Sequence, residues 1–349
     1  MTVPETHQRV VIHRAGSFDQ LKVESHPALF AGPGEVLVAV KASGINYADV
    51  IVRMGLYASA KELVGWPITP GFEVSGVVEA VGADVTGVEV GQRVLAVTLF
   101  DGYATQVCVP AHQVFPLPDD MGFVEAAGLP AVFMTAWMAL SFLAHPRPGD
   151  AVLVHSAAGG VGGSLVQLAK AKGCRVVGVV GRSHKVDVAR ALGCDVVIDK
   201  STEDLWAKAR EAAPDGYDVV LDANGVSTLS DSYDALRAAG KLVVYGFGSM
   251  MPRDAGRPNY LKLAVDFLRT PRFSPLKLTN ESKSVLAFNL SYLFERTDLL
   301  SDGLGEIMDL LAAGTLRPPS ATEYAFADVA QAHRDIQSGN TTGKLVLVV

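Results

Sequence analysis

Short apolar runs separated by glycine and proline fill the first third of the chain. Four of these runs are rich in β-branched residues and span residues 36–40, 74–81, 94–97 and 103–109. Gly–Pro and Pro–Gly pairs and single glycines stand between them, as they do at turns that join strands. The pattern predicts an antiparallel, barrel-like β domain.

From Ala151 onward, apolar runs of strand length alternate with segments of helical period. Strands are predicted at 151–155, 175–180, 195–198, 218–221 and 241–246, and helices at 161–172, 183–192, 203–212 and 231–238. Ser183 is the predicted N-cap of the second helix, and Gly173 and Gly193 follow the first two helices, as glycine does at helix ends. Short apolar strands joined by helical crossovers are typical of a parallel, doubly wound sheet.

The last part of the chain is less regular. Its spacing predicts helices at 260–269 and 304–313, a strand at 285–290 and an apolar terminal strand at 344–349.

Composition narrows the class of protein. The chain has 349 residues, more than the roughly 250–300 at which a single core stops growing, so two domains are expected. Hydrophobic residues make up 49% and charged residues 19%, which excludes a disordered chain. A net charge of −7 gives no reason to expect nucleic acid or an anionic membrane as a partner.

Cysteine content and the start of the chain bear on location. Three cysteines, Cys108, Cys174 and Cys194, are too few for a disulfide framework or a four-cysteine zinc site. The opening residues, MTVPETHQRV, lack the apolar segment of a signal peptide. Both features favour a cytoplasmic location.

One uncharged run has the length of a membrane-spanning helix. Residues 126–144 include no charged side chain, and about 20 such residues span a bilayer. Gly128 and Pro130 interrupt the run near its start. The remaining helix would be ~21 Å long, which is shorter than the ~30 Å hydrocarbon core. We therefore expect a buried helix, and membrane insertion is not expected.

A glycine-rich loop, Ser156-Ala157-Ala158-Gly159-Gly160-Val161-Gly162-Gly163, joins the strand at 151–155 to the next helix. The dinucleotide fingerprint is G-x-G-x-x-G, and here Ala157 takes the place of its first glycine. Gly159 would let a pyrophosphate approach the backbone, and Gly162 would let the helix pack on the strand. The motif therefore predicts a dinucleotide site at Ala158, Gly159, Gly160, Val161 and Gly162.

The end of the next strand bears on which dinucleotide binds. NAD enzymes place a carboxylate there for the ribose 2′-hydroxyl, whereas this chain has Gly181-Arg182-Ser183-His184-Lys185. Arg182 and Lys185 could bind a 2′-phosphate, and Arg182 could also stack on adenine. The sequence favours NADPH over NADH; the alternative is that both cations are solvated surface charges.

These motifs resemble those of the medium-chain dehydrogenase/reductase superfamily over nearly the whole chain, and within it the zinc-free quinone oxidoreductase (zeta-crystallin-like) group. The segments that carry the resemblance are residues 44–49 (GINYAD), 53–57 (RMGLY), 70–78 (PGFEVSGVV), 91–94 (GQRV) and the glycine loop. Residues 288–293 and 343–348 look most similar to the vesicle amine transport protein-like branch.

The resemblance implies an α/β fold with two domains. A GroES-like, β-rich catalytic domain would comprise residues 1–125 and 292–349. A Rossmann domain with a doubly wound parallel sheet would comprise residues 126–291 and bind NADP.

The resemblance also implies individual roles. Asn46 takes the family position beside the nicotinamide, Thr135 and the pair Gly246-Phe247 take cofactor-lining positions, and Asn224 is a further candidate cofactor contact. Tyr57 is the best visible phenol for a hydrogen bond to an oxyanion or for a proton, the alternative being a purely structural tyrosine.

The same comparison argues against a metal mechanism. Zinc relatives carry a cysteine ligand where Asn46 stands and a histidine where Phe72 stands, and their four-cysteine lobe has no counterpart after Arg93. Without a metal, a hydride acceptor must already be activated, which fits a quinone or an alkene conjugated to a carbonyl. We therefore expect NADPH-dependent reduction of such small molecules.

Some positions depart from the bacterial members of the group. A tyrosine after the third strand is replaced by Asp199 or Lys200, an arginine near the C-terminus by Gly339 or Asn340, and a further tyrosine by Ile51. Substrate contacts therefore do not transfer from those relatives.

Two alternatives remain at this level. Tyr57-x-x-x-Lys61 has the spacing of a short-chain dehydrogenase pair, but it lies upstream of the glycine loop and not downstream. The second is a non-enzymatic or weakly enzymatic NADPH-binding protein that contacts lipid through residues 250–277, where basic and apolar side chains alternate. A lid or a dimer contact is the more common use of such a segment.

A homodimer is expected, because the strand at 285–290 could be an edge strand that pairs across a dimer axis.

Overall fold

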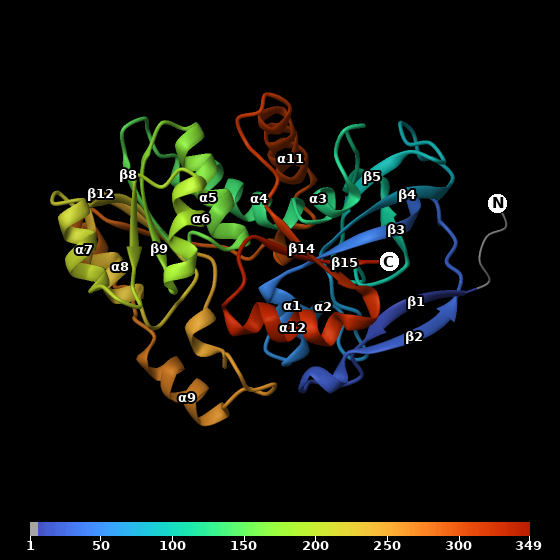
Figure 1. Cartoon of the computed structure of the whole chain (residues 1–349), viewed down its shortest axis with the longest axis horizontal. Coiled ribbons are helices and arrows are strands. Elements are labelled where there is room, and N and C mark those ends of the chain that lie inside the picture. Colours follow the sequence, from blue (N-terminus) through green and yellow to red (C-terminus); the bar gives the residue numbers. More distant parts are fainter. Residues whose placement is uncertain (1–5) are drawn as a thin grey trace.

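Two main sheets lie side by side along the long axis of the molecule (Figure 1). The structure, a computed structural model, describes residues 6–349. A separate two-stranded sheet joins β1 (Thr6–Val11) to β2 (Lys22–Pro27) beside the first main sheet.

The first main sheet has seven strands and is mostly antiparallel. In order across the sheet the strands are β14 (Ala321–Ala325), β15 (Lys344–Val348), β3 (Glu35–Ile45), β4 (Glu73–Val81), β5 (Arg93–Val97) and β7 (Val114–Pro116), with β6 (Gln106–Pro110) also paired to β3. Valines of β3, β4 and β5 form a buried core. β15 pairs antiparallel with β3, so the end of the chain returns to this sheet.

The second main sheet has six parallel strands. In order they are β10 (Val196–Asp199), β9 (Arg175–Val180), β8 (Ala151–His155), β11 (Tyr217–Asp222), β12 (Leu236–Val244) and β13 (Ser284–Ala287). The order reverses between β8 and β11. This is the switch point at which doubly wound sheets bind ligands.

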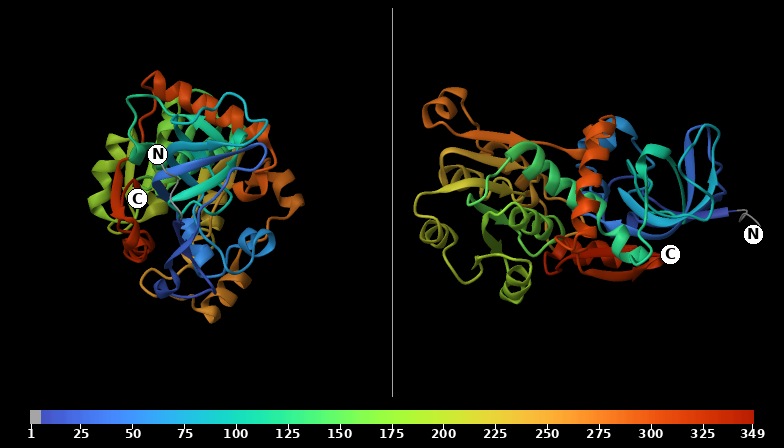
Figure 2. Two further views of the ribbon diagram at one scale, coloured as in Figure 1. Left: turned by 90° about the vertical axis from the view of Figure 1, so that its right-hand side faces the viewer. Right: turned by 90° about the horizontal axis from the view of Figure 1, so that it is seen from above.

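Helices cover the faces of the parallel sheet and bridge the two halves. They are α1 (Tyr47–Arg53), α2 (Ala58–Leu63), α3 (Phe123–Ala127), α4 (Pro130–Trp137), the π-helix η3 (Met138–Ala144), α5 (Gly160–Ala171), α6 (Val186–Ala191), α7 (Leu205–Ala212), α8 (Leu229–Asp234), α9 (Tyr260–Arg269), α10 (Pro275–Glu281), α11 (Thr297–Ala312) and α12 (Val329–Ser338). Seen from above, α11 stands between the two halves (Figure 2).

The uncharged run at 126–144 is a buried element, as expected. It forms the end of α3, then α4 and η3, and most of its side chains are buried. Pro130 occupies the first turn of α4, where its missing N–H costs no hydrogen bond. Within residues 6–349 no helix is long and apolar enough to cross a membrane.

Two local predictions were wrong. Ser183 does not cap α6. It opens a short 3-10 turn, Ser183–Lys185, and its hydroxyl donates to Asp199 instead (2.5 Å). The helix expected at 231–238 ends at Asp234, because the chain from Leu236 is extended and pairs in parallel with β11.

The predicted strand at 285–290 is β13, shorter than expected and at the edge of the parallel sheet. Between β12 and β13 the chain leaves the sheet and forms α9 and α10, and α9 projects from the lower side of the molecule (Figure 1).

Candidate functional site

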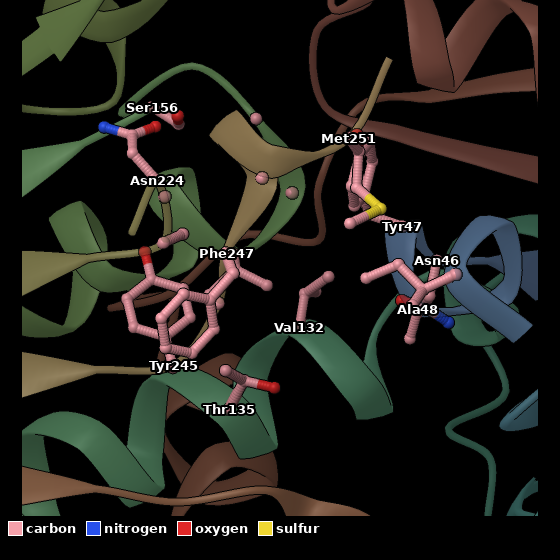
Figure 3. Close-up of a pocket in the computed structure, with 18 of the residues that line it drawn as sticks. Asn46, Tyr47, Ala48, Val132, Thr135, Ser156, Asn224, Tyr245, Phe247 and Met251 are labelled. Carbon is pink, nitrogen blue, oxygen red and sulfur yellow. The ribbon is translucent and has the colours of Figure 1, made fainter. Parts of the chain in front are cut away.

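A cavity of about 1460 Å³ is lined by residues of both main sheets. It opens at the carboxyl ends of β8 and β11, at the switch point. Asn46, Tyr47 and Ala48 stand on one side, Ser156, Asn224, Tyr245 and Phe247 on the other, and Val132 and Thr135 between them (Figure 3). Every candidate residue from the sequence lines this cavity: Asn46, Tyr57, Thr135, Ala158, Gly159, Gly160, Val161, Gly162, Gly181, Arg182, Lys185, Asn224, Gly246 and Phe247.

The glycine loop places backbone N–H groups, without intervening side chains, at the edge of the cavity. Gly159 is the N-cap of α5, so the N–H groups of the first turn face the loop. At Gly162 a Cβ atom would lie 2.1 Å from the carbonyl oxygen of Ser156, so only glycine lets the helix approach the strand this closely. Ser156 itself has φ +58°, a left-handed conformation that costs a non-glycine residue free energy and marks a constrained turn.

The glycine loop is also tied to the opposite half of the molecule. Gly343, directly before β15, donates its N–H to the carbonyl of Ala158 (3.0 Å) and forms a parallel bridge with Gly159. The residue directly before the last strand therefore contacts the glycine loop.

A buried carboxylate fixes the turn that follows β11. Asp222 is fully buried and accepts hydrogen bonds from the N–H groups of Asn224 (2.8 Å) and Gly225 (3.0 Å). Its second oxygen accepts from the hydroxyls of Thr228 (2.7 Å) and Ser232 (2.8 Å). Among residues 6–349 the Nδ2 group of Asn224 has no hydrogen-bond partner. This donor lies in a residue that lines the cavity.

His155 lies beneath the same turn as a neutral side chain. Its Nε2 is 3.1 Å from the hydroxyl of Ser232, and burial lowers its pKa to about 4. Neither Asp222 nor His155 was predicted as part of the site. The sequence signal that could have identified Asp222 is its place at the end of the apolar strand β11.

Four cations line one part of the cavity: Arg182, Lys185, Lys200 and Arg253. Burial, and then the charges of Arg182 and Arg253, lower the pKa of Lys185 to about 8. Burial and the charge of Arg253 also lower the pKa of Lys200. Neighbouring positive charges repel one another, and a bound anion would relieve this repulsion. The cluster is therefore suited to bind an anion.

The two cations chosen from the sequence are held by the chain near the C-terminus. Lys185 Nζ donates to the carbonyls of Gly339 (2.7 Å) and Thr341 (2.6 Å), and Arg182 Nε donates to Asn340 Oδ1 (3.3 Å). The sequence treated Lys200 only as a departure from the bacterial pattern and Arg253 only as part of a basic segment. Both depend on tertiary structure to reach the cavity.

One carboxylate lies near these cations but has its own donors. Asp199 accepts from the hydroxyls of Ser183 and Ser201, each at 2.5 Å, and these bonds lower its pKa to about 2.

On the opposite wall, the amide of Asn46 is oriented by two buried charges. Its Oδ1 accepts from Lys344 Nζ (2.5 Å), and its Nδ2 donates to Glu73 Oε1 (2.9 Å). Lys344 Nζ also contacts Glu73 Oε1 (2.5 Å), and Glu73 Oε2 accepts from the N–H of Ala131 (2.6 Å). Because an ammonium only donates and a carboxylate only accepts, the amide has one orientation. One N–H of Asn46 remains for a further partner.

The backbone at Asn46 is fixed by a second carboxylate. Asp49 is fully buried and accepts from the N–H of Asn46 (2.8 Å), the N–H of Gly71 (2.9 Å) and the hydroxyl of Tyr103 (3.0 Å). Burial outweighs these donors and raises the pKa of Asp49 to about 7. The first turn of α1 is thereby held against the loop before β4.

Tyr57 and Thr135 also line the cavity, with hydroxyls already bonded. Tyr57 Oη donates to Asn289 Oδ1 (3.0 Å) and lies 3.0 Å from the hydroxyl of Ser291, and burial raises its pKa. The hydroxyl of Thr135 donates to the carbonyl of Ala131 (2.7 Å), one turn earlier in α4.

Asn46 and Phe72, the residues that the sequence resemblance sets against zinc ligands, contact other side chains of this chain. Phe72 packs against the rings of Tyr57 and Phe100, and Asn46 is occupied with Lys344 and Glu73. Across the described part of the chain, no group of three or more His, Cys, Asp and Glu side chains could hold a metal ion.

Comparisons with known proteins agree with this architecture. An alcohol dehydrogenase GroES-like domain matches residues 32–119, and a zinc-binding dehydrogenase family matches residues 192–347. The synaptic vesicle membrane protein VAT-1 homolog of Danio rerio is 36% identical over 98% of this chain and 70% of its own length. The chain belongs to the medium-chain dehydrogenase/reductase superfamily. Within the superfamily it falls in the quinone oxidoreductase group, near VAT-1.

Two further relatives of this medium-chain dehydrogenase/reductase are a reductase and an oxidoreductase by name. The 2-haloacrylate reductase of Burkholderia sp is 33% identical over 97% of this chain and 98% of its own length. The crystal structure of Escherichia coli quinone oxidoreductase complexed with NADPH superposes with a TM-score of 0.84 at 27% identity, covering 98% of this chain and 100% of that one. The fold therefore consists of a GroES-like β-rich domain and a Rossmann domain.

Proposed function

We propose that this protein reduces quinones or α,β-unsaturated carbonyl compounds with NADPH, without a metal ion. The observation that carries the proposal is the fixed orientation of Asn46, a residue of the cavity lining whose amide keeps one N–H for a further partner. A fixed donor of this kind can stabilise negative charge that develops on an acceptor oxygen.

The residues present fit a dinucleotide. The backbone from Ala158 to Gly162 would hold the pyrophosphate at the N-terminus of α5. The four cations Arg182, Lys185, Lys200 and Arg253 would hold a 2′-phosphate. The remaining contacts would come from Asn46, Thr135, Gly181, Asn224, Gly246 and Phe247, all of which line the cavity.

When bound, NADPH would supply the hydride. Asn46 would donate a hydrogen bond to the acceptor oxygen through its free N–H, while Lys344 and Glu73 keep the amide from turning. Tyr57 is the proposed proton donor. Its hydroxyl proton would leave the bond to Asn289, and Ser291 would remain as a donor to the phenol oxygen.

Relatives support both acceptor classes. One is a quinone oxidoreductase complexed with NADPH and another is a 2-haloacrylate reductase. The alternative, a non-enzymatic or weakly enzymatic NADPH-binding protein that contacts lipid, predicts cofactor binding with little or no turnover.

The test is cofactor oxidation with a panel of quinones and enones. We expect NADPH absorbance to fall with at least one acceptor, and NADH to be used much less. The double variant Arg182→Ala/Lys185→Ala should erase the preference for NADPH, because two of the four cations are lost. Unchanged NADPH affinity in that variant would overturn the assignment of the 2′-phosphate site, and binding without turnover on any acceptor would overturn the reductase.

A cytoplasmic homodimer is part of the same proposal. Among residues 6–349, β13 pairs with β12 alone, and its other edge would pair with a second copy. Light scattering at micromolar concentration should give twice the mass of the chain, and a monomer would contradict the dimer.

A further inference from the structure

The cavity lining includes residues that are not assigned to the dinucleotide. The volume of about 1460 Å³ exceeds the roughly 300–1,000 Å³ of most ligand pockets. Two apolar segments are among these further lining residues. They are one face of α9 with Leu263, Phe267 and Leu268, and the chain after β13 with Phe288, Leu290 and Leu293.

α9 presents apolar side chains without burying any of them. Phe267 is 71% exposed and Leu268 is 76% exposed, although both line the cavity. The polar residues of the helix lie on a separate stripe, where Lys262 pairs with Asp266 and donates to the carbonyl of Ser249 (2.9 Å). A large apolar side chain at a cavity wall gains free energy only when an apolar partner covers it.

The segment after β13 joins this apolar region to the reacting end of the cavity. Asn289 and Ser291 bond to the hydroxyl of Tyr57, whereas Phe288 and Leu290 pack partly on the core and line the cavity. Polar and apolar residues therefore alternate along one short stretch. A ligand whose polar head is near Tyr57 would have an apolar wall directly beside it.

We infer that the acceptor carries an apolar chain, and that this chain lies between α9 and residues 288–294. The inference rests on the proposed function, since it names the class of acceptor: a quinone or enone substituted with an alkyl or isoprenoid tail. Its head meets Asn46 and Tyr57, and its tail covers Phe267 and Leu268 on α9.

The experiment compares acceptors that differ only in tail length. For a series of alkyl-substituted benzoquinones with NADPH, kcat/KM should rise by about two- to fourfold per methylene over the first several carbons. The rise should come mainly from KM, because the tail is remote from the reacting atoms.

Substitutions in α9 test whether this helix causes the dependence of kcat/KM on tail length. Phe267→Ser/Leu268→Ser should flatten the dependence on tail length, and because neither side chain is buried the helix should still form. Leu276→Ser is the matched control, because Leu276 on α10 is 78% exposed and is absent from the cavity lining, so this variant should keep the full dependence. Equal loss in both variants, or no tail dependence in the unaltered protein, overturns the inference.

A binding measurement separates this inference from the proposed function. Calorimetry with alkyl hydroquinones, which are not reduced, should show affinity that rises with tail length and falls in the α9 variant. Tail-dependent binding without turnover on any acceptor would support the inference and refute the reductase. Turnover of unsubstituted quinones, with no tail dependence in either measurement, would support the reductase and refute the inference.

Other occupants of the α9 face give different results. If Phe267→Ser/Leu268→Ser abolishes flotation with phosphatidylserine vesicles, or halves the mass in solution, while tail dependence is unchanged, the face serves a membrane or a second copy. Either result overturns the inference.

Discussion

The two walls of the cavity are built in different ways. On the glycine-loop wall the proposed binding groups are backbone N–H groups, and glycines without side chains leave them accessible. One stretch of chain supplies these groups. On the Asn46 wall the functional group is a side-chain amide, oriented by Glu73 and by Lys344, which is 298 residues away in sequence.

The difference determines how each wall can fail. The glycine loop is sensitive to added volume, because a Cβ at Gly162 meets the carbonyl of Ser156. The Asn46 wall is sensitive to charge, because Glu73 and Lys344 are both buried and each neutralises the other. Substitutions that change charge and substitutions that add volume should therefore affect the two walls differently.

The largest expected effect is on the Asn46 wall. Lys344→Met leaves the carboxylate of Glu73 buried without its cation, which should lower the free energy of unfolding by about 3–5 kcal/mol. Urea denaturation measures the change. The double variant Lys344→Met/Glu73→Gln should recover most of the stability, and failure to recover any would contradict a charge effect.

Removal of the amide itself should affect turnover more than stability. Asn46→Ala takes away the oriented donor, and we expect kcat to fall by about 100-fold, the scale of losing one oxyanion donor. Tyr57→Phe is the comparison, because it removes the proposed proton donor. If Tyr57 acts as a general acid, kcat should fall by about 100-fold or more in this variant. A kcat within threefold of the unaltered protein in both variants would remove Asn46 and Tyr57 from the mechanism.

Adding a single methyl group at Gly162 tests the close approach in the glycine-loop wall. Gly162→Ala should cost about 1–3 kcal/mol of stability through overpacking and weaken NADPH binding, since α5 must move away from Ser156. Gly305→Ala is the control. Gly305 lies in α11 with open space around its Cα, so the same change there should be neutral or slightly stabilising. Equal behaviour of the two variants would refute the close-approach argument.

The smallest effect is a pH dependence of cofactor affinity. The pKa of Lys185 is lowered to about 8, so the side chain loses its proton as the pH rises through that value. Because the protonated form attracts a 2′-phosphate, NADPH should bind up to about tenfold more weakly at pH 9 than at pH 7, while NADH should change little. Fluorescence titration checks this, and Lys185→Met should abolish the difference.

The glycine-loop wall could be predicted in detail because its determinants are local. A strand, a loop and a helix follow one another directly, and Gly159 and Gly162 occupy the positions that the motif assigns to them. The same reasoning was wrong at Ser183, where a nearby acceptor, Asp199, competes with the helix end for the hydroxyl. It was also wrong at 231–238, where pairing with β11 overrides helical spacing.

The Asn46 wall could be predicted only in part. The sequence identified Asn46 as the residue at the position of a zinc ligand in relatives. It did not connect Asn46 with Lys344 or Glu73, which both contact its amide. It also did not place Lys200 and Arg253 among the cavity-lining residues. These pairings join segments that are far apart in sequence, so no local spacing reveals them.

By itself, the sequence determined the two types of sheet, the glycine-rich turn between β8 and α5 and the chemical type of residue at each candidate position. Those features depend on periodicity and on steric needs within a few residues. Only the tertiary structure decided which charges meet. β15 pairs antiparallel with β3 so that Leu345 lies opposite Ile45, and this register brings Lys344 to Asn46. A shift of one residue would turn the ammonium to the other face of the sheet, because side chains alternate along a strand.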